Sequence, residues 1–350
     1  MFQMEELSEN PNSVIVRRLT KSYGSVKAIE NVSFRIGRGE VVGFLGPNGA
    51  GKSTTMRIIA GLMPATSGSV HICGISVANN ADMTRKHIAF MPENNPLPEE
   101  LRVGEYLKFR AEIKGVPKSE IRSRVDEVMD ICQLKRTASK KIIGNLSKGF
   151  RQRVGIADAI LSRPDVIILD EPTIGLDPHQ ILAIRELICS LRGKMSVIIS
   201  SHILPEIELV CDRVIIINQG TVVASGSPQS LRKDFIPYDR YEVSLKASRE
   251  VLEDVLKRAE LELEIESASE QSADGYVDYV LKAPQNSNLG AKIISELSKD
   301  AMLTPRQVAY KAPTLEEIFM SATRRSWEQL RGLNESSKMV EEIDKESVEK

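Results

Sequence analysis

A chain of 350 residues is long enough for two domains, and 41% hydrophobic with 27% charged residues is typical of a globular protein. A net charge of −1 gives no electrostatic reason to expect nucleic-acid binding. The four cysteines lack paired spacing, which predicts reduced thiols and not a disulfide or zinc framework. No apolar run approaches the roughly 18 residues needed to cross a bilayer. Residues 1–12 are polar and acidic, so we expect a disordered N-terminus and no signal peptide.

The most specific motif is a glycine-rich loop that fits the phosphate-binding pattern G-x-x-x-x-G-K-[S/T]. Short β-like segments at 14–16 and 28–36 and an apolar strand at 41–45 precede it, and a helix predicted over 54–62 follows it. Glycines let successive backbone N–H groups surround phosphate oxygens, and the helix N-terminus favours the same anion. We therefore expect a nucleoside triphosphate to bind at Gly46, Pro47, Asn48, Gly49, Ala50, Gly51, Lys52, Ser53 and Thr54. Lys52 would reach the β- and γ-phosphates, and the Ser53 hydroxyl would ligate Mg²⁺.

A helical insertion is predicted over about 93–165, between strands of the nucleotide domain. Residues 66–74 predict a turn and a short strand, and 86–91 predict a further strand. Apolar residues recur at three- and four-residue spacing between 103 and 134, which indicates two helices broken at Gly115-Val-Pro117. Another helix follows Ser147, a candidate N-cap, and ends near Leu161.

Two acids follow the apolar strand predicted at 166–169. Asp170 and Glu171 would face the crevice at the carboxyl end of a parallel sheet. Asp170 suits Mg²⁺ coordination through water, and Glu171 suits polarising the attacking water. The alternative is a structural N-cap for the next helix, but two acids at the end of a buried strand are costly without a function.

The rest of this domain alternates strands and helices, which predicts an α/β fold ending near residue 237. After a helix through Leu191, an apolar strand at 197–200 leads to Ser201-His202, and 214–217 with 221–224 predict a hairpin.

Residues 238–323 predict a second, α+β domain of ferredoxin-like type, because their segments read in the order β-α-β-β-α-β. Thr314 and Glu317 have the spacing of a capping box that opens a last helix. Residues 324–350 are a charged tail with few apolar residues, which we expect to be a frayed helix or disordered.

These motifs, in this order over about 14–235, resemble the ATP-binding subunit of an ATP-binding-cassette (ABC) transporter. The resemblance implies a P-loop NTPase of ABC type, with a parallel-sheet core, an antiparallel β subdomain and a helical subdomain. Residues 46–54 match its Walker A loop, 166–171 its Walker B strand, and Leu146-Ser-Lys-Gly-Phe150 its signature, usually Leu-Ser-Gly-Gly-Gln. Asp177 matches the D-loop, His202 the switch histidine that contacts the γ-phosphate, and Tyr23 the aromatic residue that stacks on adenine.

The chain departs from the family pattern at two places. Lys148 and Phe150 replace a glycine and a glutamine of the signature, whereas Ser147 and Gly149, which contact the γ-phosphate in the family, remain. Glu93 stands where the family has the Q-loop glutamine, and its carboxylate could approach Mg²⁺ or the lytic water. Both departures are similar to exporter-type ATPases of drug, polysaccharide and gliding-motility systems.

The family resemblance also implies partners: a second ATP-binding subunit, in a homodimer or a heterodimer, and a separate integral-membrane permease. It implies ATP and Mg²⁺ as cofactors, no nucleic acid, and a place on the cytoplasmic face of the membrane through the permease. A soluble ABC ATPase acting on DNA or ribosomes is the alternative. Only 118 residues separate Lys52 from Asp170, too few for a long coiled coil, and there is one cassette where translation-type members have two. A non-hydrolysing regulatory module is disfavoured because Glu171 and His202 are both present.

Overall fold

The computed structural model describes residues 12–201, 203–285, 288–299, 303 and 305–324. Its contacts divide the chain into two compact units, which meet in the sequence between Pro228 and Gln229. The sequence predicts this boundary at residue 237. The division comes earlier because helix α8 (Pro228–Phe235) and the segment after it are bonded to the second unit, where Gln285 Nε2 donates to the carbonyls of Lys233 and Ile236. Among the described residues, no helix is long and apolar enough to cross a membrane.

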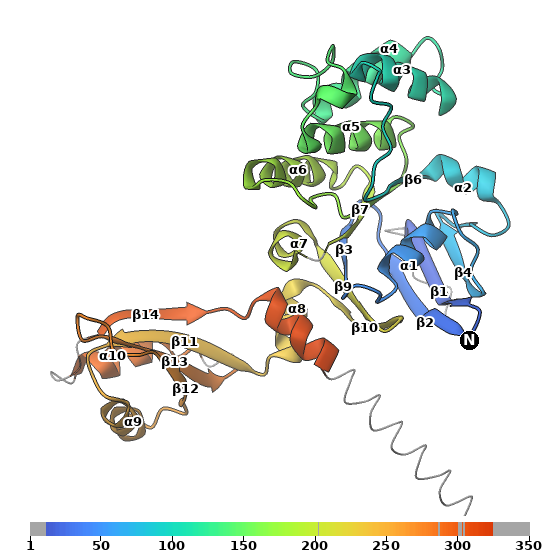
Figure 1. The fold of residues 1–350 in the computed structure, drawn as a ribbon. Coiled ribbons are helices and arrows are strands. Elements are labelled where there is room, and N and C mark those ends of the chain that lie inside the picture. The colour runs from blue at the N-terminus through green and yellow to red at the C-terminus, as the bar shows by residue number, and fades with distance from the viewer. Residues whose placement is uncertain (1–11, 202, 286–287, 300–302, 304, 325–350) are drawn as a thin grey trace, which may run out of the picture. The chain divides into compact units, whose positions relative to one another are not determined.

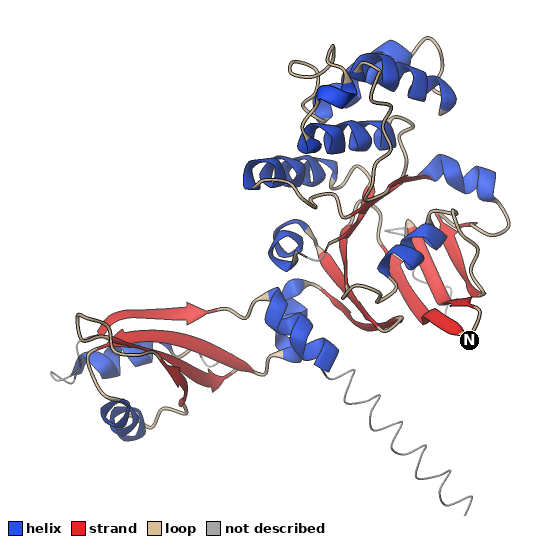
Figure 2. Cartoon of the chain, in the orientation of Figure 1, coloured by secondary structure: helices blue, strands red, loops and turns tan. Residues whose placement is uncertain are grey.

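The first unit is built around a six-stranded sheet with the strand order β10-β9-β3-β8-β7-β6 (Figures 1 and 2). The strands are β3 (Val41–Leu45), β6 (Ile88–Met91), β7 (Val166–Asp170), β8 (Ser196–Ser200), β9 (Arg213–Asn218) and β10 (Thr221–Gly226). All pair in parallel except β10, which is antiparallel to β9 and forms the predicted hairpin with it. Strands β3, β7 and β8 are buried along their whole length, which explains the run of apolar residues in each.

A four-stranded antiparallel sheet packs beside the parallel one, with the order β2-β1-β4-β5. Its strands are β1 (Val14–Tyr23), β2 (Val26–Ile36), β4 (Ser67–Ile72) and β5 (Ile75–Ser76). Helix α1 (Lys52–Ile59) contributes Met56, Ile58 and Ile59 to a core that it shares with apolar residues of both sheets. The predicted parallel-sheet core with an antiparallel β subdomain is therefore confirmed.

The helical subdomain lies between β6 and β7 in the chain. It contains α3 (Val103–Ile113), α4 (Ile121–Ile131), the short 3-10 helix η1 (Ile143–Asn145) and α5 (Lys148–Ile160), and α6 (Pro178–Leu191) follows β7. In Figure 1, α3 and α4 lie beyond α5, on the side of the first unit that faces away from β2 and β10. The predicted break at Gly115-Val-Pro117 falls between α3 and α4, as expected.

The structure differs from the sequence-based predictions at three places. Residues 86 and 87 do not open a strand but end helix α2 (Ala81–His87), which the sequence does not predict because Thr84 is its only buried residue. Helix α7 (Leu204–Val210) is also not predicted, since seven residues are too few to show a helical period. Strand β1 continues to Tyr23 instead of ending at residue 16; its second half is polar and partly exposed.

The second unit carries a four-stranded antiparallel sheet with the order β12-β13-β11-β14. Its elements are α8, β11 (Tyr238–Leu245), α9 (Arg249–Arg258), β12 (Glu264–Ala268), β13 (Val277–Pro284), α10 (Gly290–Lys299) and β14 (Pro305–Lys311). From β11 to β14 this is the predicted β-α-β-β-α-β order. Thr314 and Glu317 exchange hydrogen bonds between side chain and backbone N–H, so the predicted capping box is confirmed at the start of a helix over 315–324.

Candidate nucleotide-binding site

The phosphate loop connects buried β3 to helix α1, and two of its glycines are required by close packing. Gly51 is the N-cap residue of α1 with φ 103°, and a Cβ there would lie 2.5 Å from Ile29 Cγ2. A Cβ at Gly46 would lie 2.4 Å from the carbonyl oxygen of Ile217. No side chain larger than hydrogen fits at either position, so the backbone of the loop curves tightly just before the helix begins.

Lys52 is the first residue of α1, and its side chain folds back into the loop. Its Nζ donates to the carbonyl oxygen of Gly46 at 2.7 Å and to that of Pro47 at 3.2 Å. Burial lowers the pKa of Lys52, while the carboxylates of Glu171 and Asp170 act in the opposite direction. The ammonium group therefore lies within electrostatic reach of both acids.

Most of the other loop residues predicted to bind nucleotide are accessible. Pro47, Asn48 and Gly49 are exposed, Ser53 and Thr54 are partly exposed, and Ala50 is buried. The backbone N–H groups of Ser53 and Thr54 belong to the first turn of α1, where no carbonyl of the helix can accept from them. The first turn of α1 thus offers donors and the Ser53 hydroxyl to an anion with a bound cation.

Ser200 joins the two predicted Walker B acids. Asp170 is the last residue of β7 and Glu171 follows it, and both side chains are buried. The Ser200 hydroxyl, at the end of neighbouring β8, donates to Asp170 Oδ1 at 2.6 Å and accepts from the backbone N–H of Glu171 at 2.8 Å. Glu171 has φ 50°, a left-handed conformation that is uncommon outside glycine. No sequence motif marks Ser200, because its role depends on the pairing of β7 with β8.

The signature residues lie in a second group, together with the D-loop. Ser147 is exposed at the N-cap position of α5, but its side chain makes no capping hydrogen bond there, so the N-cap prediction holds for position only. The Gly149 N–H donates to Gln180 Oε1 at 3.1 Å. Asp177 is the N-cap of α6 and accepts from the Gln180 N–H at 2.9 Å. Gln180, which no sequence motif marks either, therefore links the signature to the D-loop.

The two departures from the family pattern lie next to this group. Lys148 extends over the D-loop, since a Cβ at Gly175 would lie 2.6 Å from its Nζ. Glu93 is exposed in the loop after β6 and lines a cavity of about 420 Å³ with Lys148, Arg151 and Gln152. The structure thus places Glu93 beside the start of α5, among cationic side chains.

Tyr23 ends β1 and is 48% exposed. Its hydroxyl donates to Met63 Sδ at 2.9 Å, and Lys21 Nζ lies 5.3 Å from the ring centroid. The ring is accessible enough to stack on a flat ligand. His202, the predicted switch histidine, lies outside the described residues.

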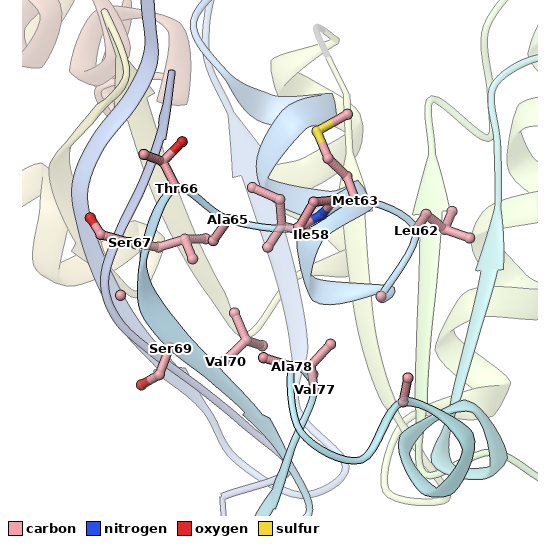
Figure 3. A pocket seen from close by; sticks show the side chains of 15 residues that line it. Ile58, Leu62, Met63, Ala65, Thr66, Ser67, Ser69, Val70, Val77 and Ala78 are labelled. Atoms are coloured by element: carbon pink, nitrogen blue, oxygen red, sulfur yellow. The ribbon is translucent and has the colours of Figure 1, made fainter. Parts of the chain in front are cut away.

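Met63 also lines a separate pocket of about 400 Å³ between α1, β4 and α2 (Figure 3). The lining is apolar or small and polar, from Leu19 and Ile58 through 61–70 to Val77, Ala78 and Ala81. None of these lining residues is charged, so this pocket does not suit a triphosphate.

Comparison with known proteins decides the family. A family model described as ABC transporter matches residues 29–174, and one described as an AAA domain matches 140–209. The bacitracin transport ATP-binding protein BcrA of Bacillus licheniformis is 39% identical over 65% of this chain and 73% of that protein. The chain belongs to the ABC transporter ATP-binding proteins.

The Nod factor export ATP-binding protein I of Ralstonia nicotianae is 31% identical over 89% of this chain and 93% of that protein, so the similarity extends into the second unit. Among solved structures, a dimeric ATP-binding cassette in a post-hydrolysis state with ADP and Pi has a TM-score of 0.55 and 28% identity, over 61% of this chain and 98% of that one. This ABC protein is accordingly an ATPase, the ATP-binding subunit of a transporter.

Proposed function

We propose that two copies of this ATPase close head to tail, so that each ATP contacts the phosphate loop of one copy and Ser147 and Gly149 of the other. One observation carries the proposal: the site residues form two groups. Lys52, Asp170 and Glu171 interact with one another, whereas Gly149 is bonded to α6 through Gln180. Ser147 is exposed and available to a second molecule. A similar cassette was solved as a dimer, which supports the proposal that two copies associate.

The donor set of the first group fits Mg²⁺, which prefers oxygen ligands. Ser200 holds Oδ1 of buried Asp170, which orients the carboxylate, and the Ser53 hydroxyl lies in the first turn of α1. Ser53 and Asp170 would hold the ion, and it would neutralise charge on the phosphates. Glu93 could approach it from the loop after β6. Glu171 would orient the attacking water, His202 would contact the γ-phosphate, and Tyr23 would stack on adenine.

We further propose that the protein powers export through a membrane permease and works on the cytoplasmic face of the membrane. Relatives named for Nod factor export and linearmycin resistance support an export role. Helix α3 offers a contact surface for the permease, because Phe109 and Ile113, one turn apart, are 54% and 59% exposed.

For the second unit we propose a role in dimerisation or regulation. If its removal changed neither the dimer nor the rate of ATP hydrolysis, that role would be contradicted.

The dimer is tested with Glu171→Gln, which removes the base but keeps the shape of the side chain. With ATP and Mg²⁺ this variant should lose turnover and elute from a sizing column as a dimer, and without ATP as a monomer. The matched control adds Ser147→Arg, a change at an exposed position, which should keep ATP binding but abolish the dimer. Continued turnover by Glu171→Gln, or an ATP-dependent dimer in the double variant, would contradict the proposal.

The permease contact is tested by replacing both Phe109 and Ile113 with glutamate and expressing this variant in the cells from which the protein comes. The wild type should co-purify with an integral-membrane protein after detergent extraction, and the double variant should not. ATP binding in solution should be unchanged in both. Equal recovery of the membrane protein with the variant would place the contact elsewhere.

A further inference from the structure

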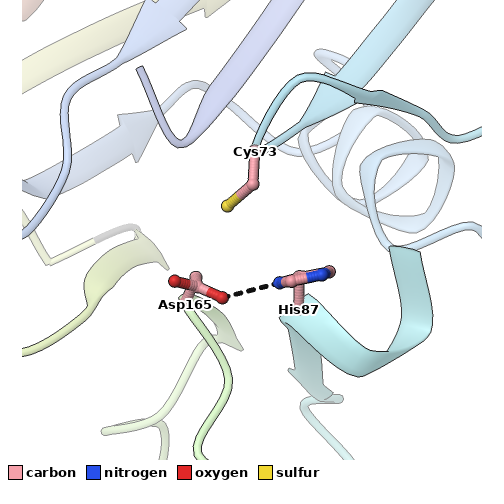
Figure 4. A group of neighbouring side chains, drawn as sticks. All are labelled: Cys73, His87 and Asp165. Carbon is pink, nitrogen blue, oxygen red and sulfur yellow. Dashed lines mark hydrogen bonds and ion pairs between the residues drawn. The ribbon is translucent and has the colours of Figure 1, made fainter. Parts of the chain in front are cut away.

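Three side chains that can bind metal ions meet near the junction of the two sheets in the first unit (Figure 4). The ligand atoms of Cys73, His87 and Asp165 all lie within 4.8 Å of one another, and each side chain is partly buried. His87 Nδ1 lies 2.7 Å from Asp165 Oδ2. In Figure 4 the Cys73 sulfur points toward the other two side chains.

The fold brings these residues together from distant parts of the chain. Parallel pairing of Ile88 with Val166 places His87 and Asp165 side by side, just before β6 and β7 begin. Cys73 follows β4 in a left-handed conformation with φ 48°, and its N–H donates to the Ser13 carbonyl at 2.8 Å. A non-glycine residue in this conformation is strained, so the turn is held by its surroundings.

The cluster is distant from the nucleotide site. Asp165 precedes β7 and Asp170 ends it, so at about 3.3 Å per residue the two lie roughly 16 Å apart on opposite ends of one strand. A metal at Cys73 would therefore be a different ion from the one proposed at Ser53 and Asp170.

We propose that Cys73, His87 and Asp165 form a binding site for Zn²⁺, with water as the fourth ligand. Thiolate, imidazole and carboxylate are the ligands of Zn²⁺ in proteins, whereas Mg²⁺ avoids sulfur. The sequence predicts no zinc framework because the cysteines lack paired spacing; here the ligands come from three segments that only the fold unites.

The surroundings of the cluster suit a metal with little rearrangement. Arg38 Nη2 lies 3.1 Å from Asp165 Oδ1, so the guanidinium orients the carboxylate and leaves Oδ2 for the ion. Zn²⁺ bond lengths of about 2.0–2.3 Å in tetrahedral geometry set ligand atoms roughly 3.3–3.8 Å apart. The contact between His87 and Asp165 would open by less than about 1 Å.

Binding has a defined proton balance. Burial raises the pKa of the Cys73 thiol, so the thiol is protonated at neutral pH. Zn²⁺ would displace that proton into solvent and form the bond to Sγ. His87 Nδ1 lies 2.7 Å from the Asp165 carboxylate, which can only accept, so Nδ1 carries the hydrogen of the neutral ring before the metal binds. That hydrogen would move to Nε2 by exchange with solvent, which frees Nδ1 for Zn²⁺ and leaves one proton released in total. The ion would then connect the turn after β4, in the antiparallel sheet, to the residues just before β6 and β7 of the parallel sheet.

The test uses the full chain, freed of metal with a chelator and kept in excess Mg²⁺. Zn²⁺ affinity is measured by competition with a chromophoric chelator, and Co²⁺ serves as a spectroscopic probe. We expect one Zn²⁺ per chain, a thiolate-to-cobalt charge-transfer band, and a higher unfolding temperature when Zn²⁺ is added. Cys73→Ser should remove the band and lower Zn²⁺ affinity at least about tenfold.

Cys189→Ser is the matched control, because Cys189 is an exposed thiol on α6 outside the cluster; it should behave as the wild type. His87→Asn is a second ligand variant, which should also lower the affinity but leave the unfolding temperature of the metal-free protein nearly unchanged. Equal Zn²⁺ affinity in wild type and Cys73→Ser, or Co²⁺ binding without a thiolate band, would overturn the proposal.

Discussion

The Ser200 hydroxyl donates to Asp170 Oδ1 at 2.6 Å, and Ser200 Oγ accepts from the backbone N–H of Glu171 at 2.8 Å. One side chain on β8 thus holds the carboxylate of Asp170, at the end of β7, and the backbone of Glu171 just after it. Ser200→Ala would leave the Glu171 N–H buried without that acceptor, which should lower the free energy of unfolding by about 1–3 kcal/mol. We expect kcat for ATP hydrolysis to fall about 10- to 100-fold with a smaller change in ATP affinity. Ser190→Ala, on the exposed side of α6, is the control, and a wild-type kcat for Ser200→Ala would contradict the assignment.

Substitutions of Lys52 and Lys148 distinguish nucleotide contacts made within one chain from those made across the dimer. Lys52→Ala should weaken nucleotide binding to the monomer at least about 100-fold, because it removes charged hydrogen bonds to two phosphates. Lys148→Ala should leave monomer binding unchanged, since we propose that the signature acts on the partner's nucleotide. Both affinities can be measured by calorimetry at low protein concentration. Micromolar binding retained by Lys52→Ala would argue against the proposed phosphate contact.

Gly51 and Gly49 form a matched pair for the loop backbone. Both have positive φ, but a Cβ at Gly49 meets nothing within 4 Å, whereas at Gly51 it would lie 2.5 Å from Ile29 Cγ2. Gly49→Ala should lower the free energy of unfolding by about 1 kcal/mol, from backbone strain alone. Gly51→Ala adds a steric clash and should cost about 3 kcal/mol or more. Denaturant titration compares the two, and equal losses would mean that the packing at Gly51 relaxes.

Gln180 accepts the hydrogen bond from the Gly149 N–H. We propose that the same N–H donates to the γ-phosphate of the ATP bound by the partner. Gln180→Leu keeps the approximate volume but removes the acceptor, so the ATP-dependent dimer should become about fivefold tighter, equal to about 1 kcal/mol. Gln180→Glu places a carboxylate near the phosphate and should weaken the dimer. Both are measured in the Glu171→Gln background by sedimentation. Two variants that shift the dimer constant in the same direction would contradict this competition.

The sequence predicts those helices and strands whose buried positions carry apolar residues at a regular spacing or in a continuous run. Strand β3 is predicted over its full span because it is apolar between a polar turn and the glycine-rich loop. Helix α2 escapes prediction because only Thr84 is buried, and without an apolar stripe there is no period to detect. The second half of β1 escapes for the same reason: its polar residues are paired by the backbone of β2 and β4.

The site divides along a similar line. Motif spacing predicts Lys52, Asp170 and Gly149 because each is tied to a local turn or strand end. Ser200 and Gln180 carry no such signal, since their contacts depend on strand pairing between β7 and β8 and on the packing of α6 beside α5. The meeting of Cys73 with His87 and Asp165 is likewise a property of the tertiary structure.

The left-handed backbone of Glu171 has a consequence for the evolution of this protein. A non-glycine residue in that conformation costs about 1–2 kcal/mol relative to the ordinary helical region. Glycine or asparagine adopts this conformation at a lower energetic cost, so selection for thermostability alone would favour replacing the glutamate. A laboratory population screened only for heat resistance should drift toward stable, inactive variants at this position, whereas selection for transport should retain the strained glutamate.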